Sequence, residues 1–139
     1  MTGGGWPLFL LLGLVTNTAL GPPFEPVLLA FAGGRPWAQA WPFAVAGSLC
    51  AGAGGALEAV LGRRVRRAAA RPEGRLWRGR TFYLLTAATA ASPLPFTVAR
   101  LAALKRRPHP VLYGASIVAG RLPRYALTLL AWQRLAGFF

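Results

Sequence analysis

The chain has 139 residues, of which 55% are hydrophobic and only 14% are charged, with 16 Lys and Arg against 3 Asp and Glu. A single domain with so many apolar and so few charged residues cannot form the polar surface of a soluble globular protein. A disordered basic tail is excluded as well, because such a segment would be poor in aromatic and aliphatic residues. One His, one Cys and three acids supply too few groups for a catalytic set, a metal module or a cofactor site. The composition therefore favours a small integral membrane protein that is not an enzyme and holds neither metal nor cofactor.

The first apolar region, residues 6–32, is interrupted by the helix-breaking sequence GPPFEP at residues 21–26. The part before the break is about 22 Å long as a helix, which is too short to cross a membrane. Two half-length segments joined by prolines predict a re-entrant hairpin over residues 6–32, because broken backbone is tolerated inside a membrane only where protein or a wet cavity covers it. The predicted breakers are Pro22, Pro23 and Pro26.

Residues 41–62 are predicted to cross the membrane, since 22 residues form a helix of about 33 Å. Trp41 stands at the entry of this span, where aromatic belts form. Small residues about one turn apart let two membrane helices approach closely, and their abundance suggests a homodimer. These small residues are Gly47, Ala51, Gly54 and Gly55.

The loop at residues 63–80 contains eight arginines and one glutamate. Such a stretch is typical of a cytoplasmic loop under the positive-inside rule, and a patch for lipid headgroups is a compatible interpretation. Arginines would attract the phosphates of a nucleic acid as well. Nucleic-acid binding is nevertheless not expected, because the chain is so apolar and the loop offers only Trp77 for base stacking.

Residues 81–104 repeat the first pattern, since an apolar half leads into a break at Pro93 and Pro95. If this segment crossed the membrane, the basic loop 63–80 and the basic residues 105–107 would lie on opposite sides, against the positive-inside bias. The charge distribution therefore favours a second re-entrant hairpin over residues 81–104, with both basic stretches in the cytoplasm.

Residues 111–132 are again long enough to cross, with Arg121, Pro123 and Arg124 near the middle. A charge at mid-membrane costs about 2.5–3.5 kcal/mol on an insertion scale. Two arginines there indicate an interior that is lined by protein, hydrated or occupied by an anion. Alternatively, the helix is offset and both side chains reach an interface.

The chain thus contains a hairpin followed by a span, twice. Many transporters consist of inverted repeats whose broken helices meet near the membrane midplane. One crossing between the two units would place the hairpins on opposite faces of the membrane, pointing at each other. The predicted fold class is an all-α integral membrane protein, with residues 1–139 as a single domain of two facing re-entrant hairpins and at least two transmembrane helices.

This order of features resembles the DedA family, which is also called the SNARE-associated Golgi protein or VTT-domain family. The resemblance covers roughly residues 15–132 and implies translocation, by flipping or scrambling, of an anionic lipid such as a polyprenyl phosphate or a phospholipid. It implies coupling to the proton or sodium gradient and a place in the bacterial cytoplasmic membrane, with membrane lipids as the partners. It rests on PPFEP (22–26), Gly62-Arg63, SPLPF (92–96) and the ending from Gly120 to Tyr125.

The resemblance also implies roles for individual residues. Glu25 matches the acid of the family's first hairpin, and Glu58 resembles its second acid about one turn later than the family pattern; both would carry the coupling proton. An ion pair between Glu25 and an arginine, and interfacial exposure of Glu58 or its pairing with Arg63, are the alternatives. The residues expected to bind the lipid headgroup are Arg100, Arg121, Arg124 and Tyr125.

Three function classes remain open at this point. Lipid translocation is the first. The second is a non-transporting scaffold or assembly protein, in which the hairpins pack against a larger partner. The third is a small channel or transporter for ions or solutes.

Overall fold

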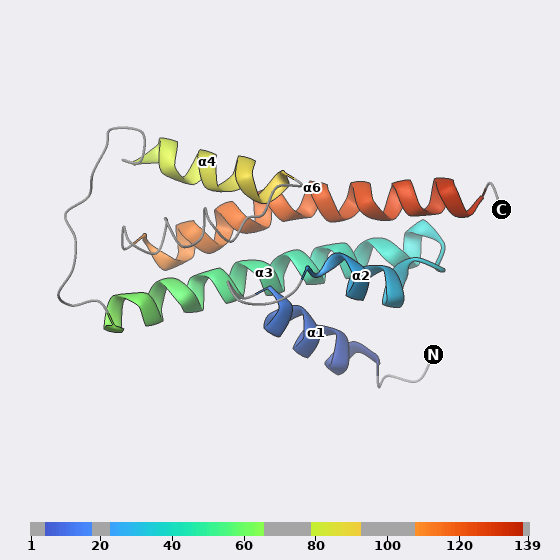
Figure 1. Ribbon diagram of the computed structural model, residues 1–139, viewed down its shortest axis with the longest axis horizontal. Coiled ribbons are helices and arrows are strands. Elements are labelled where there is room, and N and C mark those ends of the chain that lie inside the picture. Colours follow the sequence, from blue (N-terminus) through green and yellow to red (C-terminus); the bar gives the residue numbers. More distant parts are fainter. Residues whose placement is uncertain (1–4, 18–22, 66–78, 93–107, 138–139) are drawn as a thin grey trace.

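The computed structural model of the protein describes residues 5–17, 23–65, 79–92 and 108–137, with the backbone alone at 62–65 (Figure 1). All regular structure in these ranges is helical, so the expectation of an all-α chain is confirmed for them. The helices are α1 (Gly5–Thr16), α2 (Glu25–Ala32), α3 (Trp37–Val65), α4 (Arg80–Ala91) and α6 (Pro110–Ala136).

The long helices α3 and α6 run antiparallel through the centre of the fold (Figure 1). They cross where two glycines face each other: a β-carbon on Gly114 would lie 2.7 Å from the carbonyl oxygen of Gly52, and one on Gly52 would lie 2.9 Å from the carbonyl oxygen of Gly114. Only residues without a side chain allow two helix backbones to approach so closely.

Two other glycines of α3 also pack against residues of the same chain. Gly47 packs under the ring of Phe24, and Gly55 packs under Ile117. The glycine-rich face that suggested a homodimer is therefore covered by the protein's own helices. A homodimer stays a prediction and would need a different face.

The first hairpin bends beside the middle of α3. Helix α1 runs parallel to α3, because Trp6 stacks on Phe43 with ring centroids 4.3 Å apart and a β-carbon on Gly13 would lie 3.3 Å from that of Cys50. Helix α2 runs back toward the start of α3 (Figure 1). The chain therefore reverses between α1 and α2, within the region where the prolines predicted a break.

Local chemistry explains both sides of this break. Helix α1 ends where the side chains of Thr16 and Asn17 donate hydrogen bonds back to the carbonyl oxygens four residues earlier, at 2.7 and 2.8 Å. Helix α2 begins at Glu25 with Pro26 in its first turn, where the missing N–H of proline is tolerated. Pro23 precedes the N-cap Phe24, and Pro22 lies outside the described residues.

Helix α4 bears the same relation to α6 as α1 bears to α3. It runs parallel to α6, because Phe82 faces Tyr113 near the start of both helices, and Gly120 packs on Ala90 near the end of α4. The backbone N–H of His109, just before α6, donates to the hydroxyl of Tyr83 at 3.2 Å.

Helix α4 thus begins at the end of α6 at which the chain enters α6. The second re-entrant hairpin over residues 81–104 stays a prediction. Its breakers Pro93 and Pro95, and Arg100, lie outside the described residues.

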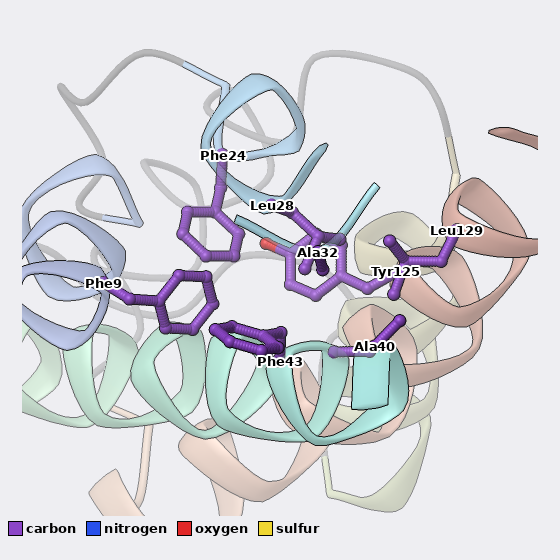
Figure 2. Packing of buried hydrophobic residues seen from close by; sticks show 9 residues of the cluster. Phe9, Phe24, Leu28, Ala32, Ala40, Phe43, Tyr125 and Leu129 are labelled. Carbon is purple, nitrogen blue, oxygen red and sulfur yellow. The ribbon is translucent and has the colours of Figure 1, made fainter. Parts of the chain in front are cut away.

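The two short helices approach the centre from opposite ends. Helix α1 ends near the middle of α3, α4 ends near the middle of α6, and the two long helices are antiparallel (Figure 1). The aromatic residues of the first half form a core between α1, α2, α3 and α6. The ring of Phe9 packs edge to face against Phe24 and Phe43 with centroids 5.4 and 5.0 Å apart, and Tyr125 points into the same cluster (Figure 2).

The outer surface of the described helices carries many exposed large apolar side chains. Four exposed tryptophans share one end, because Trp6 stacks at the start of α3, Trp37 and Trp41 belong to that start, and Trp132 lies beside Gly33. The exposed apolar residues of the helix sides include Leu8, Leu11, Val15, Leu49, Leu57, Leu61, Leu84, Val111, Leu112, Leu122, Leu127 and Leu130.

Among the described residues, one helix is both long and apolar enough to cross a membrane, namely α3 over Trp37–Leu61. A buried core helix of a soluble protein would pass the same test, so this is a weak sign of a membrane protein. Helix α6 has 27 residues but is less apolar, with Arg121 and Arg124 at its middle. Its predicted crossing at 111–132 stays a prediction.

The glycine crossing yields a first prediction. Replacing Gly52 with Val should lower the free energy of unfolding by about 1–3 kcal/mol, because the new side chain would overlap Val118 and the backbone at Gly114. Ala53→Val, on the exposed face of the same helix, should change it by less than about 0.5 kcal/mol. Denaturant unfolding of both variants in detergent measures the difference, and equal stabilities would contradict the crossing.

Candidate functional site

Four elements meet at the middle of α6. The end of α1, the beginning of α2 and the end of α4 all contact the single helical turn from Arg121 to Tyr125. We call the side chains of Glu25, Arg121 and Arg124 the central ion cluster. Arg121 and Arg124 lie three residues apart and therefore share one face of the helix, which continues through Pro123.

A single carboxylate oxygen holds both arginines. Glu25 Oε1 lies 2.6 Å from Arg124 Nη2 and 3.5 Å from Arg121 Nη1. The three side chains are only 12–20% exposed. The ion pair between Glu25 and an arginine, which was the alternative to a proton-carrying role, is thus present in the structure.

The cluster has an excess of positive charge. Two guanidinium groups and one carboxylate sum to +1 for the side chains in contact. In a partly buried place such a charge is weakly screened by water. Paired guanidinium groups can donate several hydrogen bonds in fixed directions to the oxygens of a phosphate or a carboxylate, so the arrangement is suited to holding an anion.

Three further contacts position the arginine turn. The guanidinium group of Arg124 also donates to the backbone carbonyl of Ser92 at the end of α4. The hydroxyl of Tyr125 donates to Asn17 Oδ1 at 2.9 Å, beyond the end of α1. Arg121 lies 5.8 Å above the ring of Tyr125, within the range of a cation–π interaction. Each half of the chain is therefore tied to the same turn.

Tyr125 thus acts as a structural link in this geometry. Its side chain is fully buried, and its hydroxyl is engaged by the buried Asn17. The sequence-based expectation that Tyr125 binds a headgroup stays a prediction, and the structure adds a positioning role.

Glu58 lies apart from the central ion cluster. It follows Gly55, which packs on Ile117, and the antiparallel course of α3 carries it further toward the start of α6 and away from Arg121. The two acids expected to carry protons are therefore not neighbours. Arg100, the third arginine expected to bind the headgroup, lies outside the described residues.

Sequence reasoning missed Asn17 and Ser92. Asn17 was detectable, because the polar triplet from Thr16 to Thr18 interrupts an otherwise apolar run. Ser92 contributes its backbone carbonyl, for which no side-chain pattern gives a signal. Within the described part of the chain, no group of three His, Cys, Asp or Glu side chains could hold a metal ion.

The charge excess yields a second prediction. Glu25→Gln should lower the free energy of unfolding by about 1–3 kcal/mol, because it leaves two guanidinium groups facing each other without a carboxylate. Arg121→Gln should cost less, since the 2.6 Å pair between Glu25 and Arg124 remains. The double variant should be more stable than Glu25→Gln alone. Denaturant unfolding of the three proteins tests this order of stabilities. A double variant with a lower free energy of unfolding than both single variants would refute it.

Known proteins provide no further guide to this site. No protein-family model matches the chain, and comparisons with curated proteins and with solved structures found no match either. What the protein does is therefore inferred from its residues and their geometry.

Proposed function

We propose that this protein moves an anionic lipid, such as a polyprenyl phosphate or a phospholipid, across the bacterial cytoplasmic membrane. The observation that carries the proposal is the arginine pair at the middle of a long helix, partly buried and held by one carboxylate. A phosphate headgroup cannot enter hydrocarbon alone, because the transfer of a charge into a low dielectric is prohibitively costly. Arginines at mid-depth lower that barrier, while the lipid tail stays in the bilayer.

The exposed surface supports a membrane location. Apolar side chains cover the sides of the helices, and the tryptophans gather at one end, as in an aromatic belt. At the other end α3 finishes in the arginine-rich loop, and α4 and α6 begin. We place this basic end in the cytoplasm, following the positive-inside rule.

In a membrane, the fold would work as an inverted repeat. The hairpin of α1 and α2 would enter from the tryptophan end, and the segment that starts with α4 would enter from the basic end. Both would reach the central ion cluster, where broken backbone is covered by protein. Proton coupling belongs to the same proposal: a proton on Glu25 would cancel the charge that holds the arginines.

The topology gives a third prediction. Single cysteines are introduced at the exposed positions Gly34, Thr81 and His109 in a Cys50→Ala background, which removes the only native cysteine. An impermeant thiol reagent added outside the vesicles should label Thr81→Cys and His109→Cys in inverted vesicles, whose outer face is cytoplasmic. It should label Gly34→Cys in right-side-out vesicles. Labelling of Thr81→Cys and His109→Cys from opposite sides would mean that residues 81–104 cross the membrane.

Transport gives the fourth prediction. Purified protein in liposomes should translocate a headgroup-labelled phospholipid or a polyprenyl phosphate, and both Glu25→Gln and Arg121→Ala should reduce the rate about tenfold or more, the equivalent of one charge-assisted hydrogen bond. Arg134→Ala is the matched control, because it removes an exposed arginine from the end of the same helix and should leave the rate unchanged.

The same assay separates the other function classes. A rate that is equal in all four proteins and no higher than in empty liposomes would favour a scaffold protein. Ion or solute flux without lipid movement, lost in Arg121→Ala, would favour a small channel or transporter.

A further inference from the structure

We infer that Glu25 is an internal substitute for the anion: its carboxylate occupies the arginine pair in the empty protein and must leave when a phosphate group binds there. This inference rests on the proposed function, in that it takes the central ion cluster as the anion site. It adds that the site is self-occupied, so that binding is an exchange of one anion for another.

The geometry of the contact is that of a ligand in a site. One oxygen of Glu25 lies within 3.5 Å of nitrogens from both Arg121 and Arg124, as an oxygen of a bound phosphate would. Glu25 comes from a different element than the arginines, 96 residues earlier than Arg121 in the chain. The side chain of Glu25 can therefore turn away from the arginines while α2 stays packed and the helix that carries the arginines is unchanged.

The position of Glu25 is suited to such an exchange. It is the first residue of α2, a helix of eight residues that begins directly after the break. A carboxylate in the first turn is stabilised by the positive end of the helix dipole even when it is not paired with an arginine. The carboxylate of Glu25 is thus still stabilised electrostatically when a phosphate has displaced it from the arginines.

The charge balance supports exchange over permanent pairing. The side chains of Glu25, Arg121 and Arg124 carry a net charge of +1, so the cluster still attracts an anion while Glu25 is bound. A phosphate also offers more acceptor oxygens than the single oxygen that Glu25 uses, and can receive hydrogen bonds from both arginines at once. Removing the competing carboxylate should therefore strengthen anion binding. The same change removes the acid that is proposed to carry the coupling proton, and so should still slow transport.

The test is a binding measurement in uncharged detergent micelles, with two ligands in separate arms: inorganic phosphate and short-chain phosphatidic acid. Glu25→Gln should bind at least one of them about tenfold more tightly than the wild type, because one charge-assisted contact no longer competes. Glu58→Gln is the matched control, since it changes the net charge equally but lies apart from the arginines, and its affinity should equal that of the wild type. Arg121→Ala should bind tenfold more weakly or worse.

The arms distinguish the sources of the phosphate. Tighter binding of phosphatidic acid alone would assign the site to a lipid headgroup, and tighter binding of both would assign it to phosphate in general. An unchanged or lower affinity of Glu25→Gln for both ligands, or an equal gain in Glu58→Gln, would overturn the inference.

A second measurement uses the wild type and so does not depend on the folding of a variant. The chain contains three glutamates and no aspartate, so selective ¹³C labelling of glutamate carboxyls gives three signals. Saturation with the ligand that binds should shift the Glu25 signal and leave that of Glu58 in place; binding without a Glu25 shift would refute the exchange. Translocation is measured separately. Anion exchange without lipid movement would leave this inference intact while the proposed transport fails.

Discussion

A carboxylate oxygen shared by two guanidinium groups is the constraint on which this fold depends. Two arginines on one turn at the middle of a long helix repel each other and require hydration or neutralisation. Glu25 supplies that neutralisation from the start of α2, and so determines where the first hairpin must bend. Asn17 and Ser92 then connect the ends of α1 and α4 to the same turn. Polar contacts thus define the centre of an otherwise apolar molecule.

The glycines make this central arrangement sterically possible. Gly52 and Gly114 allow α3 and α6 to cross with their backbones in contact, and Gly47 leaves room for Phe24 beneath the bend of the first hairpin. Helices α1 and α4 end beside this crossing, at Asn17 and Ser92. The result is two half-length helices that converge from opposite ends, with their polar ends at the charged turn (Figure 1).

Much of the secondary structure was predictable from local sequence. The break at GPPFEP, the long helix that contains residues 41–62, and the helix through Arg121 and Arg124 follow from proline chemistry and from the length of apolar runs. The partners of the charged residues were harder to predict. Glu25 was a candidate both for proton transfer and for pairing, and its two arginines lie about 100 residues further along the chain, a separation over which periodicity carries no information. Asn17 left a weak signal in the sequence and the carbonyl of Ser92 left none.

The sequence by itself determined the apolar composition, the places where helices must break, and the presence of two arginines in an apolar segment. These properties depend on single residues and their neighbours in the chain. The tertiary structure decided that Gly52 and Gly55 of α3 pack on α6, that Glu58 stands apart from Glu25, and that one carboxylate serves two arginines. Such pairings depend on which helix faces meet in space, because electrostatic and packing energies depend on the distance between atoms and are insensitive to distance along the chain.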